Sequence, residues 1–186
     1  LFAHIAPLAL NAAVVFEQEY SGVEGDSASC AEFYVLLSSL SGLPLKQWIA
    51  VTGAVNQHGE MLPVAGINEK IEGYFRSCEL LGLDGLQGVL IPARNRRHLM
   101  LDPSVVEAVA QGRFHIYTAE LASQGMALLT GVTFGSLVSG EYPSDTVLGR
   151  AQRTLQRYRH ACATPQAAPG TRRLLKSHLE KRRKTL

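Results

Sequence analysis

The sequence predicts an α/β (α+β) fold in which helices pack against a mixed sheet that includes a β-hairpin. Apolar residues recur with helical spacing in several segments, and short β-rich or fully apolar segments alternate with them. Turns containing glycine or proline separate the two kinds of segment. With 186 residues, 46% of them hydrophobic and 18% charged, the chain is long and apolar enough to bury a core.

The first half of the chain predicts two helices and a hairpin. Residues 4–15 (HIAPLALNAAVV) are typical of a helix that runs into a strand near residues 13–20. A core-facing helix is expected from about residue 27 to residue 40, where the motif SGLP ends it. The β-rich stretch QWIAVTGAVN, the turn QHGE and the return MLPVAG together predict a β-hairpin over residues 47–66.

The second half alternates helices and strands. Residues 67–82 predict a helix, QGVLIP at residues 87–92 a buried strand, and DPSVVEAVAQG a short helix with Asp102 as its cap and Pro103 at its first position. FHIYTA then predicts a strand, and ELASQGMALLTG a helix that Gly131 closes. The apolar face expected on the first of these helices consists of Ile67, Ile71, Tyr74, Phe75, Cys78 and Leu81.

Charge divides the chain into an acidic body and a basic tail. Residues 1–149 carry 7 Lys+Arg against 15 Asp+Glu, whereas residues 150–186 carry 11 Lys+Arg against the single acid Glu180. We expect a domain over residues 1–131, followed over residues 132–186 by a loop, a basic helix and a basic tail. The tail is either a solvated extension or a segment that attracts nucleic acid or another acidic partner.

Several classes of function have no support in the sequence. The chain contains no Gly-Lys dipeptide and hence no P-loop, and its 6 histidines show no zinc-ligand spacing, so His58 and His115 are interpreted as structural. No apolar run is long enough to cross a membrane. Cys30, Cys78 and Cys162 lack C-x-x-C spacing, which favours free thiols in a reducing cytoplasm.

The stretch EGDSASC at residues 24–30 raises the question of a serine nucleophile. A serine hydroxyl is inert without a neighbouring base, and a lysine amine among apolar groups favours its neutral, proton-accepting form. Lys46 follows a proline-containing loop and is interpreted as solvated, whereas Lys70 lies on an apolar-faced helix. The alternative is that Glu69, Lys70 and Glu72 form a solvated charged face, and a Ser-His-Asp triad without a G-x-S-x-G elbow also stays open.

The stretch from VEGDSASC to INEKIEGYF, followed by QGVLIPARNRRHL, resembles the proteolytic domain of the Lon family of ATP-dependent proteases. It is most similar to the group whose nucleophile motif reads E-G-D-S-A-S rather than D-G-P-S-A-G, and the resemblance covers about residues 10–130. It implies that Ser27 is the nucleophile and Lys70 its catalytic partner, that Thr52 supports the lysine, and that Glu24 is the acidic residue heading the motif. Ser29 is then interpreted as a helix-start residue.

The resemblance also implies a function. We expect a serine endopeptidase that cleaves unfolded or damaged proteins through an acyl-enzyme, with backbone N–H groups at the helix start stabilising the oxyanion. Gly25 would permit the tight turn, and the Asp26 carboxylate could either raise the pKa of the lysine or swing in and block the site. ATP and magnesium would serve an upstream module outside this chain, and the full-length protein would form a hexameric ring. The proteolytic domain of the family begins with further strands that this chain is expected to lack.

Two alternatives from other classes remain. The chain could be a catalytically silent module for interaction or assembly that keeps the Lon fold, or it could bind nucleic acid through its basic tail. The tail contains Tyr158 as its one aromatic residue, which disfavours recognition by base stacking.

Overall fold

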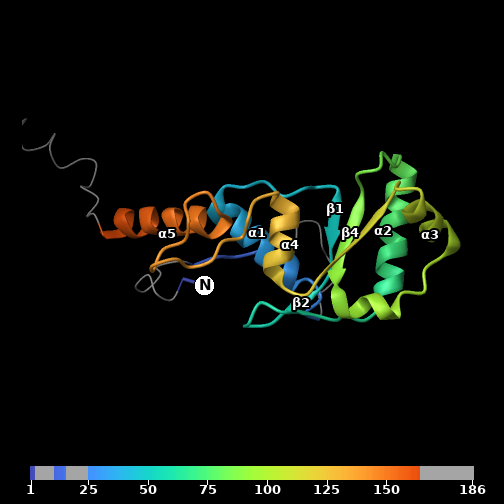
Figure 1. The fold of residues 1–186 in the computed structure, drawn as a ribbon, viewed down its shortest axis with the longest axis horizontal. Coiled ribbons are helices and arrows are strands. Elements are labelled where there is room, and N and C mark those ends of the chain that lie inside the picture. The colour runs from blue at the N-terminus through green and yellow to red at the C-terminus, as the bar shows by residue number, and fades with distance from the viewer. Residues whose placement is uncertain (3–10, 16–24, 164–186) are drawn as a thin grey trace, which may run out of the picture.

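The computed structural model describes residues 1–2, 11–15 and 25–163, and it arranges them in layers (Figure 1). The central layer is a three-stranded parallel sheet in the order β1-β4-β5. A separate antiparallel hairpin joins β2 to β3. The predicted α/β fold with a β-hairpin and packed helices is therefore confirmed. The strands are β1 (Ile49–Val51), β2 (Ala54–Val55), β3 (Met61–Leu62), β4 (Gly88–Pro92) and β5 (His115–Ala119).

The β-rich stretch QWIAVTGAVN forms two strands that belong to different sheets, where the sequence indicated one hairpin strand. Its first half is β1, which pairs in parallel with β4, and only β2 enters the hairpin. The chain changes sheets at Gly53, whose N–H donates to Ser27 O (2.9 Å) and whose carbonyl accepts from Cys30 N (3.1 Å). These backbone groups are therefore used to hold another segment. The hairpin turn forms as predicted, because Asn56 Oδ1 accepts the N–H groups of His58 and Glu60.

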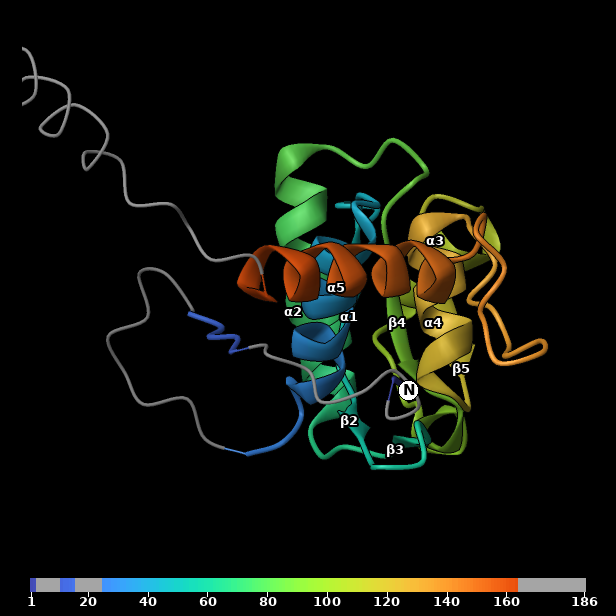
Figure 2. The ribbon, with the colours of Figure 1, turned by 90° about the vertical axis from the view of Figure 1, so that its left-hand side faces the viewer.

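Helices cover both faces of the parallel sheet (Figures 1 and 2). One hydrophobic cluster lies between the sheet and α1, α4 and α5, and a second lies between the sheet and α2 and α3. Side chains alternate across a strand, so Leu90 of β4 enters the first cluster while Val89 and Ile91 enter the second. The helices are α1 (Ser29–Ser41), α2 (Ile67–Leu81), the 3-10 helix η1 (Ala93–His98), α3 (Pro103–Ala110), α4 (Ala122–Thr130) and α5 (Val147–Ala163).

The helix ends follow the predicted signals. α1 ends at Gly42 and α4 at Gly131, and both glycines adopt left-handed backbone angles (φ 65° and 72°). Asp102 caps α3 by accepting the Ser104 N–H, and hydrogen bonds from the Ser104 hydroxyl and N–H lower the pKa of this carboxyl group. The prediction for Leu81 is wrong. As the last residue of α2 it is 90% exposed, because the helix there extends past the sheet that buries its other apolar residues.

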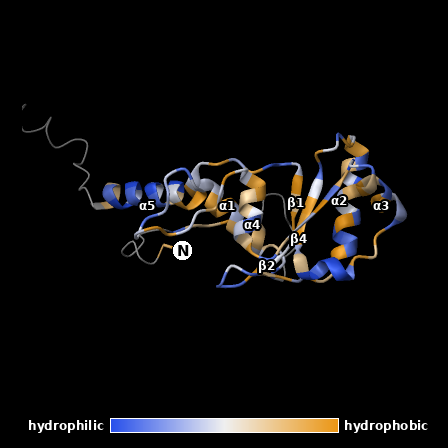
Figure 3. Cartoon of the chain, viewed as in Figure 1, coloured by the Kyte–Doolittle hydropathy of each residue, from blue (hydrophilic) through white to orange (hydrophobic). Residues whose placement is uncertain are grey.

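The predicted basic helix at the end of the acidic body is confirmed as α5. Its first half contributes the apolar residues Val147, Leu148, Ala151 and Leu155 to the first hydrophobic cluster, whereas its second half is hydrophilic and extends away from the body (Figure 3). The predicted domain boundary at residue 131 stays a prediction. Residues 164–186, residues 4–10 of the expected first helix and residues 16–20 of the strand expected near residues 13–20 lie outside the described residues, and residues 11–15 form neither helix nor strand. Within the described ranges, no helix has the length and apolar character needed to cross a bilayer.

The three cysteines differ in exposure, which predicts their reactivity. Cys30 and Cys78 are buried and Cys162 is exposed, and all three are free thiols. Burial raises the pKa of Cys30 to about 11, so this thiol stays protonated at neutral pH. We expect Ellman's reagent to react quickly with one thiol per native chain and with three thiols after unfolding. The Cys162→Ser variant should lose the fast phase, and a second fast-reacting thiol in the native chain would contradict this assignment.

Candidate active site

Ser27 lies in a tight turn immediately before α1. Gly25 has a left-handed backbone (φ 84°), which glycine adopts without steric cost, and Ser29 N donates to Asp26 O (3.0 Å) to close the turn. The sequence predicted a helix from about residue 27, but α1 begins at Ser29. Ser27 is therefore presented at the end of a loop and next to the N-terminus of the helix.

The turn is fixed to the junction between β1 and β2. Ser27 O accepts hydrogen bonds from Gly53 N (2.9 Å) and from Thr52 Oγ1 (3.4 Å). Ser29 is the first residue of α1, which confirms its prediction as a helix-start residue, and its Oγ also accepts the Val55 N–H (3.0 Å). These bonds leave the Ser27 hydroxyl uninvolved in holding the turn.

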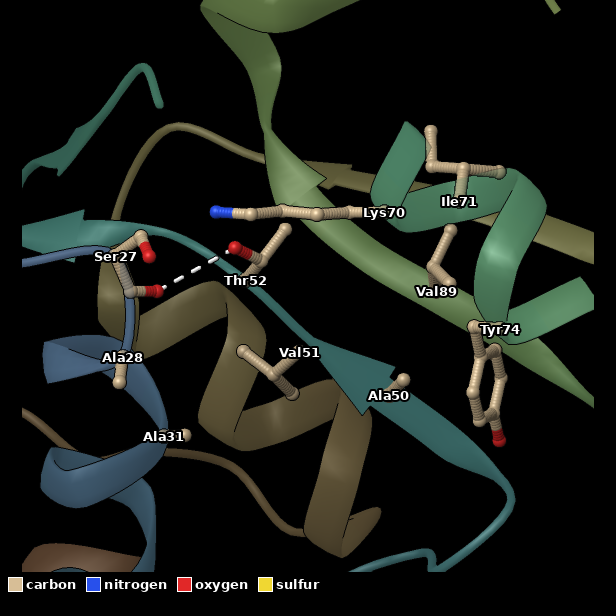
Figure 4. Close-up of a pocket in the computed structure, with 10 residues that line it drawn as sticks. All are labelled: Ser27, Ala28, Ala31, Ala50, Val51, Thr52, Lys70, Ile71, Tyr74 and Val89. Atoms are coloured by element: carbon tan, nitrogen blue, oxygen red, sulfur yellow. Dashed lines mark hydrogen bonds between the residues drawn. The ribbon is translucent and has the colours of Figure 1, made fainter. Parts of the chain in front are cut away.

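Lys70 approaches Ser27 from the opposite layer of the fold. It lies in the first turn of α2, where its N–H donates to the carbonyl of Gly66, a residue with a left-handed backbone (φ 65°). In Figure 4 the side chain extends from α2 over Thr52, and its Nζ points toward Ser27. Lys70 remains exposed. Its apolar neighbours in the sequence had indicated a less solvated side chain. The alternative of a solvated charged face is therefore correct about the exposure of Lys70. Lys70 nevertheless also lines the pocket.

Ser27 and Lys70 face each other without a direct hydrogen bond. Among the hydrogen bonds of residues 25–163, none joins Ser27 Oγ to Lys70 Nζ. Thr52 Oγ1 donates to the Ser27 carbonyl (Figure 4), whereas the sequence predicted that it would orient the lysine. Thr52 therefore positions the serine turn in this structure, and its support of Lys70 stays a prediction.

The two residues border a pocket of about 340 Å³ beside β1 (Figure 4). Most of its lining is apolar, and Tyr74 closes the end farthest from Ser27 in Figure 4. The Tyr74 hydroxyl donates to Trp48 O (3.1 Å). Burial is the main cause that raises the pKa of Tyr74 to about 12, and interaction with Cys78 is the smaller cause. The lining residues are Ser27, Ala28, Ala31, Ala50, Val51, Thr52, Lys70, Ile71, Tyr74 and Val89.

Comparison with known proteins assigns the chain to a family. Residues 21–123 match the model of the Lon protease (S16) C-terminal proteolytic domain, a match that includes both Ser27 and Lys70. The chain belongs to the Lon protease family. The predicted resemblance is thereby confirmed, and the family describes a proteolytic domain.

Individual relatives agree with this assignment. A Lon protease homolog of Escherichia coli (strain K12) is 46% identical over 124 residues, which make up 67% of this chain and 21% of that protein. A Lon protease homolog of Haemophilus influenzae is 48% identical over 124 residues with the same coverage. The archaeal Lon protease of Thermococcus kodakarensis is 35% identical over 111 residues, 60% of this chain and 16% of that protein. The chain thus spans about a fifth or less of the length of these Lon relatives.

The acidic residues of the Lon nucleophile motif lie away from the pocket or outside the described residues. Asp26 is exposed and does not line the pocket, and its carboxylate makes no hydrogen bond to residues 25–163. The blocking movement predicted for Asp26 is therefore not the arrangement seen here. Glu24, predicted as the head of the motif, lies outside the described residues.

Two backbone donors in the Ser27 turn have no acceptor among the described residues. Neither Ser27 N–H nor Ala28 N–H donates a hydrogen bond within residues 25–163. Both precede α1, whose N-terminal dipole favours negative charge. The turn therefore presents two N–H groups beside Ser27, and their role as donors to an oxyanion stays a prediction.

Sequence reasoning missed the residues that shape the pocket and fix the turn. Ala28 and Ala31 line the pocket from the start of α1, three residues apart, and Ala50 faces them from β1. The sequence did contain a signal for this wall of the pocket, because two small residues three positions apart lie on one face of a helix. The double role of Gly53 had no comparable signal, because it depends on contacts between distant segments. In the described part of the chain, no group of three or more His, Cys, Asp or Glu residues could hold a metal ion.

Proposed function

We propose that this chain is a serine-type peptidase domain that cleaves unfolded or damaged proteins with a Ser27–Lys70 dyad. The observation that carries the proposal is the approach of Lys70 Nζ toward Ser27 across an apolar pocket (Figure 4). Membership of a proteolytic-domain family supports the reaction type. Lysine is suited to this role because its amine, when neutral, accepts a proton from a neighbouring hydroxyl.

In the proposed reaction, neutral Lys70 Nζ takes the proton from Ser27 Oγ as that oxygen attacks the scissile carbonyl carbon. The tetrahedral oxyanion accepts hydrogen bonds from the N–H groups of Ser27 and Ala28, each typically contributing about 3 kcal/mol. Lys70 returns the proton to the leaving amine as the C–N bond breaks. It then activates the water that hydrolyses the acyl-enzyme and regenerates the serine.

The supporting residues have proposed roles in the same scheme. Thr52 holds the Ser27 carbonyl and, once Lys70 moves closer to the serine, hydrogen-bonds to its amine. Gly25 gives the turn its left-handed backbone. The acidic residues Glu24 and Asp26 flank this glycine and influence the access of substrate to Ser27. The apolar lining of the pocket fits an apolar substrate side chain beside the scissile bond.

The remaining expectations concern the full-length protein. We propose that this domain works in the cytoplasm as part of a longer Lon protease whose separate module uses ATP and magnesium to deliver protein substrates. We further propose that six copies assemble into a ring. Small peptides would reach the pocket without the ATP-dependent module, and this makes the chemistry testable on this chain.

Covalent labelling tests the dyad directly. A fluorophosphonate probe is expected to form a bond between phosphorus and Ser27 Oγ with loss of fluoride, and mass spectrometry of peptide digests would identify the labelled residue. Lys70→Gln should slow labelling about 100-fold or more, because the hydroxyl loses its base. Lys46→Gln, the matched loss of the one other lysine in the described residues, should label at the normal rate.

Two results would overturn the dyad. One is the absence of an adduct on Ser27 in the unmodified chain, which would favour the alternative of a catalytically silent Lon-like module. The other is equal labelling of the Lys70→Gln and Lys46→Gln variants, which would remove Lys70 from the reaction.

A further inference from the structure

A second pocket lies between α5 and the C-terminal end of α1, about 18 Å along α1 from the serine end at a rise of 1.5 Å per residue. Its volume is about 320 Å³. We call it the α5 arginine pocket. Four of its five lining residues lie on α5, outside residues 21–123 that match the Lon family, and only Ser41 lies within them. Its lining residues are Ser41, Arg150, Arg153, Thr154 and Arg157.

The three arginines of this pocket form no ion pair within the described residues. Their spacing of three and four places them on one face of α5, where like charges repel one another. The ion pair found within the described ranges joins Arg76 to Glu72 and lies on α2. The first turn of α5 contains no acidic residue, although that end of a helix favours anions over cations. An anion bound in the pocket would therefore relieve the repulsion among three positive charges on one helix face.

The guanidinium groups are already held in place. Arg153 Nη2 donates to Ser144 O (2.9 Å), and Arg157 Nη2 donates to Thr154 Oγ1 (3.0 Å). Each interaction fixes the side chain while leaving other N–H groups of the planar fork unused. An anion binding here would lose little free energy to the ordering of these side chains.

Arg150 gives a separate sign of a missing partner. Its Nε is buried and has no hydrogen-bond partner among the residues that the structure describes. A buried N–H without an acceptor costs free energy, and an ion or ligand that accepts from it would remove that cost. Buried hydroxyl-bearing residues complete the wall, since Ser41 is 6% and Thr154 8% exposed.

We infer that the α5 arginine pocket binds a terminal phosphate group, either as inorganic phosphate or on a small phosphorylated molecule. A terminal phosphate carries about −1.5 to −2 charges at neutral pH and three acceptor oxygens, which match three guanidinium forks better than one carboxylate does. The C-terminus of α1 near Ser41 carries about half a negative charge, which three cations outweigh. A phosphodiester backbone brings one charge per phosphate and is the weaker match.

Isothermal titration of the full 186-residue chain with inorganic phosphate, at constant ionic strength set with chloride, tests the inference. We expect saturable binding and a phosphate-dependent rise in melting temperature. The Arg153→Gln/Arg157→Gln variant should weaken binding at least tenfold. Both side chains are exposed, so this variant is expected to fold even where substitution of the half-buried Arg150 does not.

A control with the same charge change separates the site from general attraction. Arg113→Gln/Arg159→Gln also removes two exposed cations, one of them on α5, and neither residue lines the pocket. It should keep the affinity of the unmodified chain. Equal loss in both double variants would overturn the inference, and so would the absence of saturable phosphate binding. The inference would also be overturned if a single-stranded oligonucleotide bound and inorganic phosphate did not displace it. The ligand of the pocket would then be a nucleic-acid backbone and not a terminal phosphate.

Discussion

Replacing Ser27 by alanine is expected to lower peptide cleavage roughly 10³-fold or more while leaving the fold unchanged. The loss follows from removing the nucleophile, because the oxyanion donors and the pocket that remain supply only a residual acceleration. The fold should be preserved because the contacts of this turn with Gly53 and Thr52 use the Ser27 carbonyl, which alanine keeps. Hydrolysis of a fluorogenic peptide, with circular dichroism of both proteins, measures the two effects separately.

The matched control for this substitution is Ser39→Ala on α1, the helix that follows the Ser27 turn. Ser39 is exposed, away from the pocket, and should keep full activity. If Ser27→Ala retained a tenth or more of the normal rate, Ser27 would not be the nucleophile. A loss of helical signal in Ser27→Ala would instead show that the hydroxyl stabilises the turn.

The elements whose signals are local could be predicted well. QGVLIP is apolar at almost every position and forms β4, whose five residues are all buried. The capping sequence that begins with Asp102 starts α3, and Gly131 ends α4, as their side-chain and backbone chemistry require. Each of these signals acts within a few residues and does not depend on the rest of the fold.

Features that depend on distant contacts could not be predicted in the same way. The β-rich stretch around Thr52 looks continuous in the sequence, and only the bonds of Gly53 to the serine turn explain why it changes sheets. Leu81 continues the apolar spacing of α2, yet it lies beyond the edge of the sheet and stays exposed. Helical periodicity identifies a face but does not show how far the neighbouring layer extends.

The candidate site shows the same division. The helix carrying Lys70 and the turn carrying Ser27 were each readable from the residues, but their pairing rested on the resemblance to Lon proteases. The reason is that 43 positions separate the two residues in the sequence. The structure brings them to one pocket by placing α1 and α2 on opposite faces of the sheet. Pairing across a sheet in this way leaves no periodic signal in the sequence.

This arrangement makes the position of Lys70 depend on the second hydrophobic cluster. α1 is anchored in the first cluster through Tyr34 and Leu37, whereas α2 is anchored in the second through Ile71 and Phe75. A disturbance confined to the second cluster would therefore move the lysine relative to the serine without changing either residue.

Phe75→Ala is expected to destabilise the chain by about 3–5 kcal/mol, the usual cost of truncating a buried phenylalanine. Phe75 is 1% exposed and packs edge-on against Phe114 with 5.2 Å between ring centroids, an interaction that contributes beyond the buried area. Urea unfolding of the variant and of the unmodified chain would measure the difference in free energy of unfolding.

The control is Leu80→Ala, on the same helix as Phe75 and five residues further on. Leu80 is 88% exposed, so its truncation should change the free energy of unfolding by no more than about 0.5 kcal/mol. Similar losses in both variants would mean that α2 is not anchored through its buried face. If Phe75→Ala also slows the labelling of Ser27 under conditions where the variant remains folded, the second cluster contributes to the site by positioning Lys70. Normal labelling would show that the first turn of α2 holds the lysine independently of the packing one turn further along the helix.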